Sequence, residues 1–165
     1  MAKKTARKMS KKTAKASRRP APKKAGKKPR APSGTPSGMF KVSTGPGRSP
    51  AEIGGGLVSM FNNGQFAEIE EEFWSPAIVS CEGCGVGLEW RGRKAVEAKN
   101  NDWMSKNEIL GARATGPFVG STGFAVHFDM EVRDKASGAT RTMKEVGVYT
   151  VRNGKIVREE FMYGS

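Results

Sequence analysis

The feature that most restricts the fold is the alternation of apolar and polar residues that begins after position 107. A period of two is typical of β-strands with one buried face. The alternation divides into four segments: 108–115, 119–133, 140–152 and 155–163. Asn153-Gly154 predicts a type I′ turn between the last two segments, and residues 135–138 predict a longer turn before them. We therefore expect a four-stranded antiparallel meander.

Helices and one short strand are predicted before this meander. Ser49-Pro50-Ala51-Glu52 is a capping box with proline at the first helical position, so a helix should begin there. Gly54–Gly56 weakens that helix by roughly 1 kcal/mol per glycine, which suggests close packing against another element. An α+β domain with a curved sheet wrapped on helices follows from this order. The expected elements are helix 50–62, helix 65–73, strand 77–81, a Gly-rich loop 83–92 and helix 93–105.

Charge divides the chain into two parts. Residues 1–50 hold 16 basic residues and no acidic one, whereas residues 51–165 hold 13 basic and 16 acidic residues. The first part has too few apolar side chains to offset its chain entropy. We expect a disordered arm and linker over 1–48 and a single domain over 49–165.

A flexible cationic arm is a ligand for polyanions such as DNA or RNA, because each neutralised phosphate releases a counterion. No aromatic residue precedes Phe40, so the arm should recognise charge and not base sequence. The alternatives are a solubilising tail, a nuclear localisation signal at Lys27-Lys28-Pro29-Arg30 and an organelle transit peptide. The residues expected to bind phosphates are Lys3, Lys4, Arg7, Lys8, Lys11, Lys12, Lys15, Arg18, Arg19, Lys23, Lys24, Lys27, Lys28 and Arg30.

Several classes of protein are excluded by composition. No apolar run approaches the ~20 residues that span a bilayer, and no secretory signal is visible. One histidine and two cysteines make no convincing zinc site, and no cofactor motif is present, so we predict neither metal nor cofactor. We expect a cytoplasmic protein, associated with the nucleoid in a bacterium or located in the nucleus of a eukaryote.

The two turns determine which strand residues share a face of the sheet. The face that carries Phe124, Val126 and Phe128 is the more apolar, so we place it toward the helices. Glu145 on that face is the best candidate for site chemistry, because a desolvated carboxylate has a raised pKa unless it has a partner. An ion pair with Arg158 is the alternative, and a one-residue slip would exchange the two faces. The expected pairs are Phe128–Glu145, Phe124–Tyr149, Tyr149–Arg158, Gly147–Glu160 and Glu145–Met162.

Two further patterns have structural and functional interpretations. His127 and Asp129 lie on the other face and form either an acid/base pair or, as we favour, an interface or solvent pair. Cys81-Glu82-Gly83-Cys84 is a C-x-x-C, but no helix is predicted directly after it, so two small, partly buried thiols are favoured over redox function.

Seven segments together resemble a known family: 60–64, 73–82, 92–103, 116–119, 124–128, 145–151 and 154–161. Over residues 49–165 the chain resembles SnoaL-like proteins of the nuclear transport factor 2-like superfamily. The resemblance implies a cone-shaped fold with three N-terminal helices on a curved, mainly antiparallel sheet. It also implies a pocket on the concave face and a homodimer through the sheet. Because this fold hosts isomerases, dehydratases, cyclases, hydrolases and non-catalytic binders, the resemblance leaves the function open.

The ketosteroid isomerase branch of this superfamily offers three functional positions for comparison. Its general base falls on Cys81, with Glu82 one residue away, and its oxyanion-hole tyrosine falls on Leu57. Its second acid falls near Gly147, two residues from Glu145. This mismatch argues against steroid isomerase chemistry. Relatives often carry histidines near two positions that lack them here, Asn107 and Leu110.

We expect the body to bind a small, largely apolar ligand in a conical pocket. Carboxylate-based isomerase, cyclase or dehydratase chemistry would suit Glu145 and Glu82 as catalytic or anchoring groups. The arm would tether this domain to nucleic acid; the alternative is a non-catalytic dimeric scaffold whose arm binds DNA or RNA. The expected pocket walls are Trp90, Trp103, Phe124, Phe128, Tyr149, Arg158 and Glu160.

Overall fold

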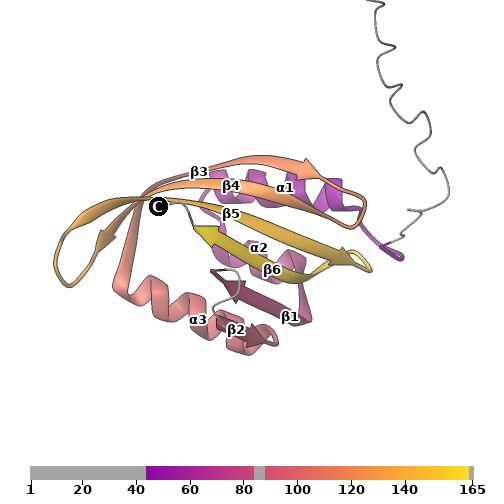
Figure 1. Ribbon diagram of the computed structural model, residues 1–165, viewed down its shortest axis with the longest axis horizontal. Coiled ribbons are helices and arrows are strands. Elements are labelled where there is room, and N and C mark those ends of the chain that lie inside the picture. Colours follow the sequence, from indigo (N-terminus) through magenta and orange to yellow (C-terminus); the bar gives the residue numbers. More distant parts are fainter. Residues whose placement is uncertain (1–43, 84–87, 164–165) are drawn as a thin grey trace, which may run out of the picture. The chain divides into compact units, whose positions relative to one another are not determined.

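The computed structural model describes residues 44–83 and 88–163 (Figure 1). The predicted nucleic-acid-binding residues, at positions 3–30, and Cys84 lie outside this part of the chain. The described elements are α1 (Pro50–Asn62), α2 (Phe66–Phe73), β1 (Trp74–Glu82), β2 (Leu88–Arg91), α3 (Arg93–Lys106), β3 (Asn107–Val119), β4 (Gly123–Asp134), β5 (Thr140–Arg152) and β6 (Lys155–Tyr163).

The strands form one mixed sheet in the order β2-β1-β6-β5-β4-β3. The predicted β3–β6 meander is confirmed, and all neighbouring strands are antiparallel except β1 and β6, which are parallel. The three helices lie on one side of this sheet (Figure 1). This α+β architecture of three helices on a mixed six-stranded sheet confirms the predicted fold class.

Three strand boundaries differ from the sequence prediction. The expected loop 83–92 contains the four-residue strand β2, which is too short to show periodicity. Strand β1 begins at Trp74, directly after α2, although Ser75-Pro76 was expected to separate them. Strand β3 continues through Val119, which we had placed in the next strand.

Helix α1 begins and packs as its sequence predicts. The Ser49 hydroxyl accepts a hydrogen bond from the Glu52 backbone, and the Glu52 carboxylate accepts one from the Ser49 backbone. A Cβ placed on Gly54 would lie 2.7 Å from Pro117 Cβ, and one on Gly56 would lie 2.6 Å from the Phe73 ring. These two glycines therefore allow the close approach that the sequence suggested.

The longer turn and the β4–β5 register are as predicted. Phe128 pairs with Glu145, and Phe124 pairs with Tyr149. Gly138 has a φ of 72°, a left-handed conformation that favours glycine. The apolar face of this hairpin joins the core, where Phe124, Val126 and Phe128 are all buried.

The β5–β6 hairpin differs from the prediction by a β-bulge. Asn153 and Gly154 form the expected turn, with φ of 50° and 70°, and Val151 pairs with Ile156. The next pair joins Thr150 to Arg158, so one extra residue enters β6 at position 157. The expected pairs Tyr149–Arg158, Gly147–Glu160 and Glu145–Met162 are therefore wrong. The observed pairs are Tyr149–Glu159, Gly147–Phe161 and Glu145–Tyr163.

Residues 44–48, which we had placed in the linker, contact the domain. The Asn153 backbone N–H donates a hydrogen bond to the Thr44 carbonyl at 2.6 Å. The Arg48 guanidinium pairs with Glu72 at 2.6 Å and lies over the Phe73 ring. Within the described part of the chain, no helix is long and apolar enough to cross a membrane.

Candidate functional site

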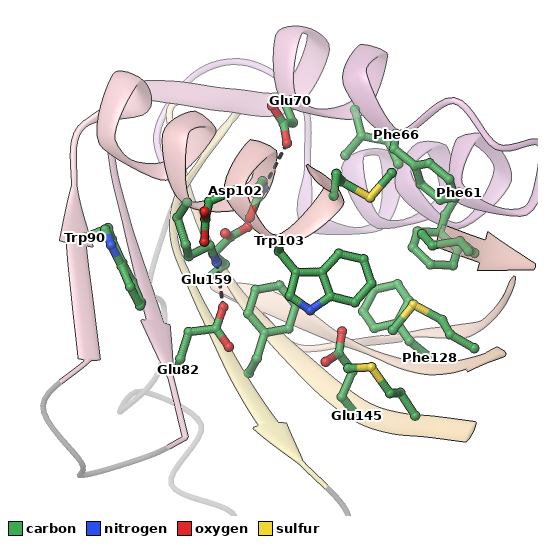
Figure 2. Close-up of a pocket in the computed structure, with 18 of the residues that line it drawn as sticks. Phe61, Phe66, Glu70, Glu82, Trp90, Asp102, Trp103, Phe128, Glu145 and Glu159 are labelled. Atoms are coloured by element: carbon green, nitrogen blue, oxygen red, sulfur yellow. Dashed lines mark hydrogen bonds and ion pairs between the residues drawn. The ribbon is translucent and has the colours of Figure 1, made fainter. Parts of the chain in front are cut away.

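A cavity of about 530 Å³ lies between the inner face of the sheet and the three helices (Figure 2). This volume is in the usual range for small-molecule sites. Leu88, Met104 and Tyr163 line it and are exposed, so they mark its opening to solvent. Nine of the lining side chains are aromatic: Phe61, Phe66, Trp74, Trp90, Trp103, Phe128, Tyr149, Phe161 and Tyr163. The charged lining residues are Glu70, Glu82, Lys99, Asp102, Lys106, Glu145 and Glu159.

Glu145 lies on β5 between Phe128 of β4 and Tyr163 of β6. Its carboxylate points into the cavity, near the indole of Trp103 (Figure 2). Burial is the main cause that raises the pKa of Glu145 to about 7; the charge of Glu82 raises it further, and Lys99 acts in the opposite direction. No hydrogen bond or ion pair holds this carboxylate within the described structure. Near neutral pH it can therefore both accept and donate a proton.

Glu82 and Lys99 form a partly buried ion pair in the lining of the cavity. Lys99 Nζ lies 2.5 Å from Glu82 Oε1, and the two side chains are only 13% and 15% exposed. The same ammonium donates a hydrogen bond to Ser80 Oγ at 3.0 Å. It also lies 5.4 Å from the ring centroid of Trp90 and 5.3 Å from that of Phe161. Lys99 thus compensates the charge of Glu82 inside the apolar cavity.

Glu159 is the most buried carboxylate of the site, at 2% exposure. The bulge in β6 turns it to the inner face, opposite Tyr149. Burial raises the pKa of Glu159 to about 7, against the opposing effects of Lys99 and of a hydrogen bond with Ser80. Its Oε1 has no hydrogen-bond partner in the described part of the protein.

Glu70 is the carboxylate that α2 contributes to the lining of the cavity. Asn100 donates a hydrogen bond to Glu70 Oε1 at 2.8 Å. Burial raises the pKa of Glu70, and the hydrogen bond from Asn100 lowers it in part. Among the described residues, no group of three or more histidine, cysteine or acidic side chains is arranged to hold a metal ion.

The predicted wall residues divide into three groups. Trp90, Trp103, Phe128 and Tyr149 line the cavity together with Glu145 and Glu82. Phe124 lies in the core, stacked on Tyr149 with ring centroids 4.9 Å apart, and does not line the cavity. Placing Arg158 and Glu160 in the wall was wrong, because the bulge turns both to the outer face of the sheet.

The outer face of the sheet also carries Arg158, the expected alternative partner of Glu145, and the predicted polar pair His127 and Asp129. Arg158 pairs with Glu89 at 3.6 Å and with Glu160 at 3.4 Å, so the alternative Glu145–Arg158 ion pair is not formed. Asp129 lies 3.7 Å from Lys144, while His127 lies on the same outer face, between Thr115 and Val146. His127 and Asp129 are thus separated from the cavity by the sheet.

The cysteine motif is only partly described. Cys81 is buried and faces outward, and its thiol donates a hydrogen bond to Glu89 Oε2 at 3.4 Å. Burial and this hydrogen bond raise the pKa of the Cys81 thiol. The position that the steroid isomerase comparison assigned to a base is therefore directed away from the cavity, and its neighbour Glu82 is directed into it.

Sequence reasoning did not identify Lys99, Glu159 or Phe161 as cavity residues. Lys99 follows Val96 by three residues and precedes Trp103 by four, which places all three on one helical face. That periodicity could have indicated its position. Glu159 and Phe161 depended on a bulge that the sequence pattern does not signal.

Comparisons with known proteins agree with this architecture. The chain belongs to the SnoaL-like domain family, whose model matches residues 49–163. Its fold of three helices on a mixed six-stranded sheet fits the nuclear transport factor 2-like superfamily. No protein with a curated description matches the sequence.

Solved structures with the same fold include several from bacteria. A proposed SnoaL-like polyketide cyclase from Mesorhizobium loti, also labelled a carbohydrate phosphatase, is 35% identical, with a TM-score of 0.66, over 70% of this chain and 100% of that chain. A proposed SnoaL-like polyketide cyclase from Jannaschia is 14% identical, with a TM-score of 0.58, over 70% of this chain and 89% of that one. A proposed polyketide cyclase from Xanthomonas campestris is 14% identical, with a TM-score of 0.54, over 70% of this chain and 90% of that one. The last two show the fold alone.

Proposed function

We propose that the SnoaL-like domain binds a small, largely apolar carbonyl compound and transfers a proton on it through Glu145. The observation that carries this proposal is a carboxylate without a partner in an aromatic cavity of about 530 Å³. The name of the Mesorhizobium loti relative, a proposed polyketide cyclase, supports the same class of chemistry.

The protonation behaviour of Glu145 suits this role. A general base works best when its pKa lies near the operating pH, and burial brings the pKa of Glu145 to about 7. The carboxylate would remove a proton from a carbon next to the carbonyl, which leaves an enolate. Return of the proton at another position gives an isomer, and attack by the enolate carbon on a second carbonyl closes a ring. Glu82, held by Lys99, would serve as a fixed polar anchor and not as the base.

Deuterium exchange provides a direct test of proton transfer. The probe is 2-tetralone, a bicyclic ketone, incubated with the full chain in heavy water and followed by NMR. We expect exchange next to the carbonyl to be accelerated, and Glu145→Gln to reduce it roughly 100-fold or more. Asp129→Asn, which removes a carboxylate from the outer face, is the matched control and should retain the rate.

The pH profile of the same reaction tests the assignment further. Only the ionised form of Glu145 accepts a proton, so the exchange rate should rise through about pH 7 and then level off. A rate that Glu145→Gln leaves unchanged would refute the role of this residue.

We also propose that the N-terminal arm binds nucleic acid without sequence preference. Positions 3–30 hold 14 basic residues and no acidic one. A random-sequence DNA duplex should bind the full chain with an affinity that falls steeply with salt. A full-length variant with these residues changed to glutamine should not bind. Salt-independent binding, or binding retained by the variant, would contradict the proposal.

We also propose that the protein forms a homodimer through the outer face of the sheet. Phe118, Val148 and Met162 are exposed there at 61%, 38% and 40%. Sedimentation should show a dimer that Val148→Asp converts to a monomer. If wild type is a monomer at all concentrations, these residues have another role.

A further inference from the structure

The cavity is lined by five carboxyl groups but only two lysines. Glu82 is paired with Lys99, and Asp102 is paired with Lys106. The two remaining carboxylates on the inner face of the sheet, Glu145 and Glu159, have no ion-pair partner among the described residues. The bound ligand therefore has to complement an acidic, aromatic cavity.

Glu159 is the carboxylate of which one oxygen accepts no hydrogen bond from the described residues. Its side chain is almost fully buried, lines the cavity, and leaves Oε1 without a hydrogen bond from the described protein. A buried acceptor without a donor is costly, so native sites usually supply one from the protein, from water or from a ligand.

The groups that face Glu159 do not supply that donor. Lys99 of α3 already donates to Glu82 and Ser80. Two further neighbours, Glu82 of β1 and Glu70 of α2, are acidic and disfavour another negative charge. Tyr149 of β5 stays a neutral phenol, because burial raises its pKa, and it makes no hydrogen bond to Oε1.

The same end of the cavity already accommodates an ammonium group. Lys99 Nζ lies between the faces of Trp90 and Phe161, 5.4 Å and 5.3 Å from their centroids, and against Glu82. Aromatic faces with a nearby carboxylate form the usual environment for organic cations in proteins. Lys99 shows that these rings and acids stabilise a cation.

We infer that the ligand of this cavity is an apolar molecule with a protonated amine, whose N–H donates a hydrogen bond to Glu159 Oε1. The inference rests on the proposed small-molecule function and specifies its ligand class. The amine neutralises the carboxylate that Lys99 leaves uncompensated, while the apolar frame contacts the aromatic wall near Trp103 and Phe128. An anionic ligand would add charge of the same sign and be rejected.

Three aromatic probes of nearly equal shape test this inference by calorimetry with the full chain. They are 2-naphthylmethylamine, 2-naphthylmethanol and 2-naphthoate. We expect the amine to bind roughly tenfold or more tightly than the alcohol at neutral pH, and the carboxylate to bind undetectably. Glu159→Gln should remove the preference for the amine and keep binding of the alcohol. Glu160→Gln, which changes the neighbouring residue on the outer face, should leave the preference intact.

A second measurement on wild type does not depend on any variant. Before binding, Glu159 is mostly protonated at about pH 6, and an ammonium in contact with it favours the ionised form. Titrations in two buffers with different ionisation enthalpies should show release of nearly one proton at about pH 6 and almost none at about pH 8.5. The neutral alcohol should release none.

The possible results separate the two proposals. Equal binding of amine and alcohol, or binding of the amine without proton release at about pH 6, overturns the inference and leaves the small-molecule site in place. A preference that disappears in Glu145→Gln but persists in Glu159→Gln overturns it as well. If none of the three probes binds, the result contradicts both the proposed small-molecule site and the inference.

Discussion

Glu159 and Glu160 are adjacent in the sequence but lie in opposite environments. Glu159 faces the cavity, is 2% exposed, and has a pKa raised to about 7 by burial. Glu160 faces outward, its side chain is 32% exposed, and it pairs with Arg158. The difference shows that the two faces of one strand place the same residue type in a buried, apolar site and in a partly exposed ion pair.

The contrast extends across the sheet. On the outer face, a hydrogen bond from Cys81 and the charges of Arg91 and Arg158 lower the pKa of Glu89. On the inner face, burial raises the pKa of Glu145 to about 7. The outer Glu89 is therefore stabilised as a charged carboxylate, whereas Glu145 and Glu159 on the inner face are available for proton transfer and ligand binding.

The largest expected effect comes from removing the cation of the inner face. Lys99→Met leaves the partly buried Glu82 carboxylate uncompensated, which should reduce the free energy of unfolding by roughly 3 kcal/mol, the lower end of the range for buried pairs. Arg158→Met on the outer face should change it by less than about 1 kcal/mol, because exposed ion pairs contribute little. Urea denaturation of both variants measures the difference. Equal losses would mean that the two faces do not differ electrostatically.

The pH dependence of stability should also differ between the faces. An unfolded glutamate loses its proton near its usual pKa of 4.5, whereas Glu145 and Glu159 keep theirs to about pH 7 in the folded protein. The folded state thus binds more protons between these values, so the contribution of these two groups to stability falls as pH rises through this window and does not change above it. The loss should be on the order of 3 kcal/mol for each of the two groups.

Glu159→Gln isolates one of these contributions. It should match wild type at about pH 5 and be more stable than wild type at about pH 8. Glu160→Gln, which removes a carboxylate from the outer face of the same strand, is the matched control. Thermal or urea unfolding across this pH range provides the measurement. A Glu159→Gln profile as steep as that of wild type would show that this carboxylate is ionised in the folded state.

Much of this arrangement could be predicted from the sequence. The capping box located the start of α1, and the turn at 135–138 fixed the β4–β5 register that brings Glu145 inward. Both signals are local, because they depend on residues within a few positions of one another. The inward direction of Glu145 therefore followed from the sequence without any tertiary information.

The rest of the site depended on non-local packing. The bulge at position 157 has no glycine or proline that would indicate it in the sequence. It places Glu159 and Phe161 on the inner face of the sheet, where we had expected Arg158 and Glu160. The parallel pairing of β1 with β6 also joins segments almost 80 residues apart, and it brings Ser80 and Glu82 beside Glu159 and Phe161. Neither feature could be deduced from alternation alone.

The smallest expected changes in stability come from two neighbouring glycines of α1, of which Gly54 faces the packed interior and Gly55 faces open space. A Cβ on Gly54 would lie 2.7 Å from Pro117 Cβ and 3.0 Å from the Phe124 ring, both in the packed interior. Gly54→Ala should therefore destabilise the protein by roughly 1–3 kcal/mol through overpacking. Gly55 has nothing within 4 Å of its added Cβ, so Gly55→Ala should stabilise the helix by roughly 0.5–1 kcal/mol. Stabilisation by both substitutions, measured by urea denaturation, would mean that α1 packs less closely on β3 and β4 than the structure shows.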